Sequence, residues 1–195
     1  RNKVRRMEYI TETFLPYARI LTPLLVEGLK ITLYVSAAAF VLSVILGAVL
    51  AVVQHFRIKG VAWLVRLYIS YFRGTPLLIQ LFLFYYGLPM VFDVMKQCPK
   101  AVALIVCLAL NSAAYISEAI RGAIDSVDQG QYEASLAFGM TRYQMMTQIV
   151  LPQAAVAAIP PITNSCMDII KMSSLGMTIG IQDIMGEAQL TAATY

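Results

Sequence analysis

Charged residues are scarce in this sequence, and their scarcity excludes an ordinary soluble domain. They make up 13% of the 195 residues, whereas hydrophobic residues make up 59%. A typical soluble domain is about a quarter charged and about half apolar. Because so few charges could not solvate the outside of a folded chain of this size, the composition predicts a membrane protein that resides in a lipid bilayer.

Residues that support common catalytic and metal chemistry are also few. The chain has one histidine, His55, and three cysteines, Cys98, Cys107 and Cys166, without C-x-x-C spacing, so we expect no metal site. It contains no G-x-x-x-x-G-K-(S/T) loop, so we expect no P-loop nucleotide site and no cofactor in this chain. A single histidine gives little support to a Ser/His/Asp hydrolase, and we expect no enzyme.

Long charge-poor runs predict four membrane spans in a single domain of residues 1–195. The clearest run, Ile31–Gln54, has 24 uncharged residues. At about 1.5 Å per residue it would extend roughly 35 Å as a helix, enough to cross a hydrocarbon core of about 30 Å. Backbone groups must be hydrogen-bonded inside lipid, so each span should be a helix. We therefore expect an all-α transmembrane bundle, with spans near residues 31–54, 62–88, 101–122 and 147–171.

Positive charges flank these spans and form no continuous basic face. The net charge of +4 therefore does not indicate nucleic acid, and we expect no nucleic-acid partner. The loop after the first span carries His55, Arg57 and Lys59 without an acidic residue, which places it in the cytoplasm by the positive-inside rule. Alternation of the spans then places residues 126–142 in the cytoplasm and the N-terminal segment outside.

The most specific pattern in the chain is E-A-S-x3-G-x9-I-x-L-P, which begins with Glu133, Ala134 and Ser135 and has its glycine at Gly139. Residues 126–142 are too short and too polar to cross a membrane. Asp128 is a suitable helix N-cap, and Gly139 can end a helix in a left-handed conformation. The sequence therefore predicts a short cytoplasmic helix. Its apolar residues would fit the cleft of a partner, although a plain turn and helix is the simpler alternative.

This pattern resembles the EAA loop of permease subunits in bacterial ATP-binding-cassette importers. Two further segments resemble the permeases for polar amino acids: Tyr71–Leu81, with F-R-G-T-P-L-L-x-Q, and Ala114–Gly122, which leads into the loop. Together the motifs cover about residues 20–190. The third EAA position is Ser135 instead of alanine, and the family's K-(D/N)-(T/S)-S-L occurs as Lys171–Leu175 with methionine in second place.

The resemblance implies a multi-pass permease of the bacterial inner (plasma) membrane that moves a polar amino acid into the cytoplasm by alternating access. The expected partners are an ATPase dimer, which binds the ATP and Mg, an extracytoplasmic binding protein, and a second permease copy or homologue. The residues expected to couple to the ATPase are Glu133, Ala134, Ser135 and Gly139. The alternative is a passive channel or membrane-embedded sensor without an ATPase. A cationic, amide-bearing or cystine-like substrate and a homodimer or heterodimer all remain open.

Polar residues within the spans are candidates for the substrate pathway. Arg73 lies in the second span beside Gly74 and Pro76, and its guanidinium could bind a substrate carboxylate. It could equally form a structural pair with Glu118, or extend to the cytoplasmic face. The other candidates are Thr75, Tyr115, Glu118, Asn164, Asp168 and Lys171. The last three share one side of the fourth span by their spacing, and that side could line a cavity or seal a subunit interface.

Similar permeases have a fifth span, which the last residues of this chain are not expected to supply. The longest charge-free run there, Met172–Gln182, has 11 residues and would extend only about 16 Å as a helix. We therefore expect four spans, with the chain ending outside or at the start of an absent fifth helix. As a truncated copy it should transport poorly.

Overall fold

The computed structural model describes residues 15–56 and 60–194, and the elements assigned within them are all helical. The α-helices are α2 (Leu15–His55), α3 (Val61–Gly74), α4 (Leu77–Phe82), α5 (Leu88–Val91), α6 (Lys100–Asp125), α7 (Gln129–Ala137), α8 (Arg142–Met145), α9 (Leu151–Ser173) and α10 (Ile184–Thr194). Short π-helical or 3₁₀ stretches join some of them: η2 (Leu83–Gly87), η3 (Asp93–Gln97), η4 (Met146–Val150) and η5 (Ser174–Ile179). The predicted all-α membrane fold class is confirmed.

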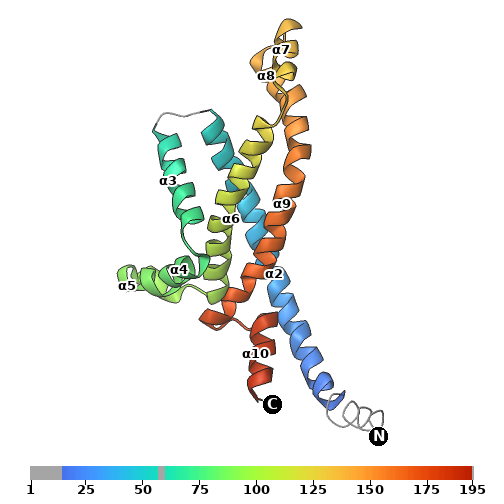
Figure 1. Cartoon of the computed structure of the whole chain (residues 1–195). Helices are drawn as coiled ribbons and strands as arrows, with labels where there is room; N and C mark the ends of the chain where they lie inside the picture. Colours follow the sequence, from blue (N-terminus) through green and yellow to red (C-terminus); the bar gives the residue numbers. More distant parts are fainter. Residues whose placement is uncertain (1–14, 57–59, 195) are drawn as a thin grey trace.

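Three long helices form the body of the molecule, with α2, α6 and α9 side by side (Figure 1). Among the described residues, Tyr17–His55, Lys100–Asp125 and Arg142–Ile179 are each long and apolar enough to cross a membrane. Helix α2 starts at Leu15, well before residue 31, where the first span is predicted to begin. Its 41 residues would extend about 60 Å, roughly twice the thickness of a hydrocarbon core, so part of α2 projects beyond the core.

The segment predicted as the second span, residues 62–88, is not one straight helix. Helix α3 and the helices that follow it, Leu77–Val91, meet at an angle of 108°, so they form a broken span or a re-entrant loop. In Figure 1, α4 and α5 turn away from α3 and extend sideways from the bundle. Within the described residues, three helices are long and apolar enough to be spans, or four segments if this bent pair counts as one span.

Buried apolar side chains from several helices form the core. Leu81 of α4, Leu104 and Leu108 of α6, and Ile169 of α9 are almost completely buried in one cluster. Close contact between α2 and α6 depends on Gly47, because a Cβ atom there would lie 2.7 Å from Cγ2 of Ile116. Small residues at helix contacts are typical of membrane bundles.

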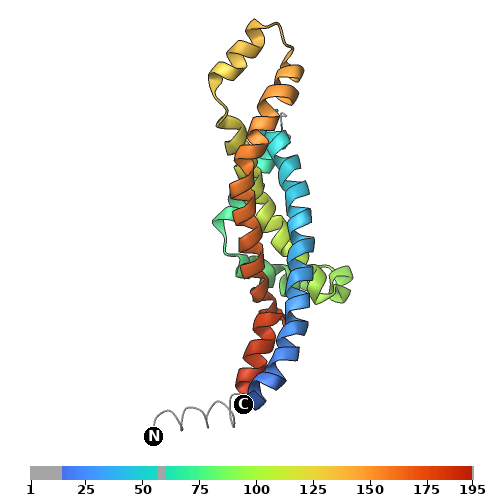
Figure 2. The ribbon, with the colours of Figure 1, turned by 90° about the vertical axis from the view of Figure 1, so that its right-hand side faces the viewer.

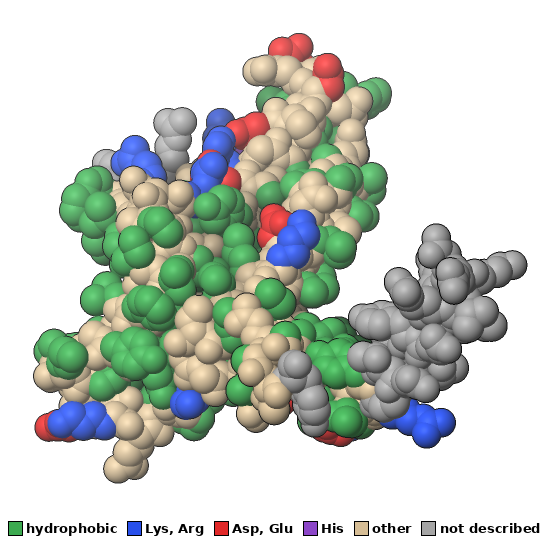
Figure 3. Space-filling model, turned by 60° about the horizontal axis from the view of Figure 1, so that its bottom comes forward, with side chains coloured by type: hydrophobic (Ala, Val, Ile, Leu, Met, Phe, Trp, Pro, Cys, Tyr) green, Lys and Arg blue, Asp and Glu red, His purple; other side chains and the backbone are tan. Residues whose placement is uncertain are grey.

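The outer surface is apolar, as expected for a chain surrounded by lipid. On α2, Leu33, Val41, Ile45 and Val49 are all more than half exposed. Figure 3 shows hydrophobic side chains spread over one face, with charged side chains in small separate groups. Apolar side chains on both the inner and outer sides of a helix are the pattern of a membrane bundle.

The two ends of the molecule differ. At one end, α7 and α8 project beyond the long helices as a loop (Figure 2). At the other, α10 packs against the first half of α2, where the Ile184 amide donates to Oγ1 of Thr32 at 3.2 Å. His55 is at the same end of α2 as the projecting loop (Figure 1). Arg57 and Lys59, which also entered the topology argument, lie outside the described residues.

Candidate functional site

The projecting loop contains a short helix with well-defined ends. Asp128 is its N-cap, as the sequence predicts, and its carboxylate accepts a hydrogen bond from the Gly130 amide at 2.7 Å. At the other end Gly139 has a φ of 75°, and its amide donates to the Leu136 carbonyl while the Met140 amide donates to that of Ser135. These two bonds form a Schellman motif, which a left-handed glycine favours. Helix α7 is therefore fixed at both ends.

The side chains of α7 divide between the loop interior and solvent. Ser135 is buried and its hydroxyl donates to the Gln131 carbonyl at 2.6 Å, whereas Glu133 and Ala134 are exposed. Leu136 is 53% exposed and Phe138 is 88% exposed. Two apolar side chains at the tip of a rigid projection form a surface suited to a partner protein.

The bend between α3 and α4 follows from Pro76. Thr75 is extended, with φ −124° and ψ 145°, as the residue before a proline prefers. Because Pro76 has no N–H and the chain leaves the helical path, carbonyl groups at the end of α3 lose their helical partners. In lipid, those groups need other donors.

Two buried amide side chains supply these donors. Gln80 Nε2 lies 3.1 Å from the Phe72 carbonyl oxygen, 3.0 Å from that of Thr75 and 2.7 Å from Thr75 Oγ1. Asn111 Nδ2, on α6, donates to the Phe72 carbonyl and to Gln80 Oε1, both at 3.0 Å. Gln80 and Asn111 are only 4% and 3% exposed. We call Gln80, Asn111, Phe72 and Thr75 the amide clamp.

Neither Gln80 nor Asn111 was singled out as a site residue from the sequence. Gln80 was noted only as part of a motif, and Asn111 lies in the apolar third span. The available signal was an uncharged polar side chain inside a predicted span, since such side chains are costly in lipid unless they are hydrogen-bonded. Thr75, which was predicted for the substrate pathway, lies in the amide clamp.

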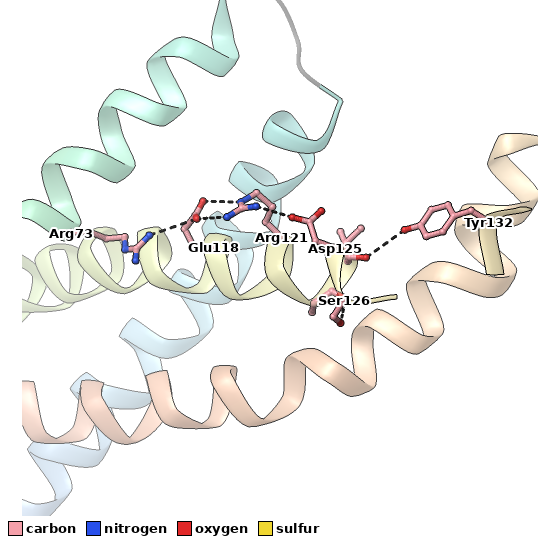
Figure 4. A network of polar contacts seen from close by, with 8 residues as sticks. Arg73, Glu118, Arg121, Asp125, Ser126 and Tyr132 are labelled. Carbon is pink, nitrogen blue, oxygen red and sulfur yellow. Dashed lines mark hydrogen bonds and ion pairs between the residues drawn. The ribbon is translucent and has the colours of Figure 1, made fainter. Parts of the chain in front are cut away.

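Charged residues form a chain of ion pairs along α6 (Figure 4). Glu118 Oε2 lies 3.6 Å from Nη1 of Arg73 on α3 and 2.8 Å from Nη2 of Arg121. Arg121 Nη1 also donates to Asp125 at 2.7 Å. The guanidinium of Arg73 lies over the ring of Tyr115, 5.4 Å from its centre. Of the arrangements considered for Arg73, the structure contains the pair with Glu118, at a distance too long for a hydrogen bond.

A pocket of about 180 Å³ lies between α6 and α9. Its polar lining consists of Asn111, Ser112 and Tyr115 from α6 and Asn164, Ser165 and Asp168 from α9. Three of the predicted pathway residues, Tyr115, Asn164 and Asp168, are therefore brought together. Lys171 does not line the pocket, but its ammonium lies 3.2 Å from the Asp168 carboxylate.

Comparisons with known proteins agree with this architecture. The family described as "Binding-protein-dependent transport system inner membrane component" matches residues 43–194. The probable amino-acid ABC transporter permease protein PatM of Vibrio harveyi is 43% identical over 178 residues, which are 91% of this chain and 80% of that protein. The arginine transport system permease protein ArtQ of Bacillus subtilis (strain 168) is 40% identical over 174 residues, 89% of this chain and 78% of ArtQ.

A solved structure has the same fold. The crystal structure of an amino acid ABC transporter with histidines superposes with a TM-score of 0.83 and 35% sequence identity, covering 88% of this chain and 79% of that chain. The sequence of this chain therefore matches these relatives over most of its length, and its helix arrangement matches that of the solved structure. The chain belongs to the family of inner membrane components of binding-protein-dependent transport systems.

Proposed function

We propose that this chain is the permease subunit of an ATP-driven importer for polar amino acids, and that substrate passes through the pocket between α6 and α9. The observation that carries the proposal is the convergence of polar side chains in that pocket, between helices whose outer faces are apolar. Polar groups inside a membrane bundle usually mark a substrate or ion path. The relatives PatM and ArtQ support amino acids as the substrate class.

The pocket suits the size and charge of one amino acid. Its volume of about 180 Å³ is below the roughly 300–1,000 Å³ of pockets for drug-sized ligands. The carboxylate of Asp168 can accept hydrogen bonds from a substrate ammonium group. Arg73 lies against Tyr115, which lines the pocket. The Arg73 side chain is 44% exposed, and its guanidinium can donate to a substrate carboxylate. The Asp168 carboxylate and the Arg73 guanidinium are therefore complementary in charge to the ammonium and carboxylate groups of an amino acid.

The loop formed by α7 and α8 is proposed to dock on an ATPase chain, which binds ATP and Mg. Glu133, Ala134, Leu136 and Phe138 are exposed on it, with Ser135 and Gly139 fixing its shape. Closure of an ATPase dimer would move this rigid projection and, through α6 and α9, the pocket. One subunit would enclose only half of a substrate pathway, so a second permease copy or homologue is needed to complete it. An extracytoplasmic binding protein would deliver the substrate.

Uptake into vesicles separates this proposal from a passive channel. The permease is reconstituted with its ATPase and binding protein, and labelled amino acid is measured inside with and without ATP. An importer accumulates substrate above the outside concentration only with ATP and both partners present. Equal uptake without ATP, up to the outside concentration, would instead establish a channel.

A further inference from the structure

We propose that Asn111 and Gln80 form a sensor that transmits substrate occupancy of the pocket to the bend between α3 and α4. The inference rests on the proposed function of the pocket. It assigns Asn111 to substrate contact and Gln80 to a positioning role, and it identifies α4 and α5 as the part of the chain that responds.

Asn111 belongs to the pocket and to the amide clamp at once. Its side chain lines the pocket, while its Nδ2 donates to the Phe72 carbonyl and to Gln80 Oε1. Both N–H groups of the amide are therefore used. Within the described part of the chain, its Oδ1 accepts no hydrogen bond. This oxygen is the acceptor that Asn111 offers to a substrate ammonium, amide or guanidinium group.

Gln80 carries the signal from Asn111 to the bend. Its Oε1 accepts from Asn111, and its Nε2 donates to the Phe72 carbonyl of α3 and to the carbonyl and hydroxyl of Thr75. The same amide thus joins α6, the end of α3 and the start of α4. Hydrogen bonds in such a chain polarise one another, so a new bond to Asn111 Oδ1 would strengthen its bonds to Gln80 and Phe72.

The backbone at the bend can convert this change into movement. Only Thr75 and Pro76 separate α3 from α4, and both are extended instead of helical. Changes of a few backbone angles at such a junction reorient the whole segment beyond it. That segment ends in α5, which extends sideways from the bundle beyond the end of α3 that faces away from the α7–α8 loop (Figure 1). By the topology argued above, this is the outer side, where a binding protein would arrive.

A fluorescent reporter on α5 tests the sensor. Met90 is 86% exposed, so Met90→Cys can be labelled with an environment-sensitive dye in a Cys98→Ser, Cys107→Ala and Cys166→Ala background. L-arginine, L-glutamine and L-cystine are added in turn to the assembled transporter, and binding and emission are both measured. We expect the ligand that binds to shift the emission.

The Gln80→Leu variant should separate binding from response. It removes the amide that reaches the bend but leaves every polar group of the pocket, so the dissociation constant should stay within about threefold while the emission shift disappears. Thr75→Val, which removes the hydroxyl that accepts from Gln80 and donates to the Tyr71 carbonyl, should reduce the shift and leave binding unchanged. Asn111→Leu should lose about tenfold in affinity and the shift as well.

A matched control is available on α9. Gln153 is exposed and, among the described residues, its amide donates to the Ile149 carbonyl of η4, so Gln153→Leu should bind and respond normally. A full emission shift in Gln80→Leu, or an equal loss of binding and shift in Thr75→Val, would overturn the sensor. Unchanged binding in Asn164→Leu and Asp168→Asn, or no binding of any of the three ligands, would instead contradict the proposed function of the pocket.

Discussion

Arg73 and Glu118 form an ion pair that joins α3 to α6, with 3.6 Å between Nη1 and Oε2. Glu118 is held more closely by Arg121, at 2.8 Å, and Arg121 is held in turn by Asp125 (Figure 4). Removing Arg73 therefore leaves Glu118 with a cationic partner. The same geometry leaves Arg73 with one long ion pair and the ring of Tyr115, so its guanidinium can be transferred to a substrate carboxylate at little cost.

We predict that Arg73→Ala assembles normally and loses most uptake. A partly exposed ion pair at this distance contributes at most about 1 kcal/mol, whereas a charge-assisted bond to substrate is worth about 1.5–3 kcal/mol. Uptake at low substrate should therefore fall about tenfold or more. The measurements are uptake in vesicles and recovery of the assembled complex. If assembly is lost and is recovered in the Arg73→Glu, Glu118→Arg double variant, the pair is structural and the prediction fails.

A second prediction concerns the conformation of Gly139. A β-branched residue at φ 75° costs at least about 1–2 kcal/mol, so Gly139→Val should disturb the end of α7. We expect normal insertion but much weaker stimulation of the ATPase by the permease. Gly122→Val is the control, because a Cβ at Gly122 meets nothing within 4 Å and the backbone there is helical. Normal stimulation in Gly139→Val would show that the loop does not need this shape.

A third prediction concerns the exposed tip of the same loop. Phe138 is 88% exposed, and docking would bury it, so Phe138→Asp should place a charge in the interface. The permease should remain as stable as the parent but should no longer co-purify with the ATPase. Tyr143, which is 78% exposed on α8 of the same loop, provides Tyr143→Asp as a comparison for a charge placed away from the end of α7. Co-purification of the Phe138→Asp permease at the parental level would count against docking through this tip.

A fourth prediction concerns packing between α2 and α6. A Cβ at position 47 would lie 2.7 Å from Ile116 Cγ2 and 3.2 Å from the Ala113 carbonyl oxygen. Gly47→Ala should therefore push the helices apart and destabilise the bundle by about 1–3 kcal/mol. Thermal unfolding in detergent measures the loss, and adding Ile116→Ala should recover part of it. A melting temperature for Gly47→Ala equal to that of Gly122→Ala would mean that the helices adjust freely.

The sequence predicted what depends on local chemistry. Charge-free runs such as Ile31–Gln54 indicated membrane helices, and Asp128 and Gly139 indicated the ends of α7, because caps depend on one side chain or one backbone conformation. The spacing of Asn164 and Asp168 indicated a shared face. Helix α2 extends beyond the predicted span, because a helix can continue past the lipid through packing that hydropathy does not register.

The parts that the sequence did not predict depend on contacts between distant segments. Gly74 and Pro76 are residues that can interrupt a helix, but the 108° bend could not be derived from them. The link from Gln80 to Asn111 joins residues 31 positions apart. Nor could the sequence decide between a partner for Arg73 on α6 and one in the substrate, since either would satisfy a guanidinium within a membrane span. Only the arrangement of α3 against α6 brings Glu118 within reach.

ATP-driven uptake by a pocket variant tests the central claim most directly. Permease, ATPase and binding protein are reconstituted in vesicles, and initial uptake at low substrate is compared for Asp168→Asn and for Glu27→Gln, an exposed carboxylate whose contact is Lys30. If the pocket binds the substrate ammonium group, Asp168→Asn loses about tenfold in uptake, the equivalent of about 1.4 kcal/mol, and Glu27→Gln is unchanged. Parental uptake by Asp168→Asn would contradict a substrate pathway between α6 and α9.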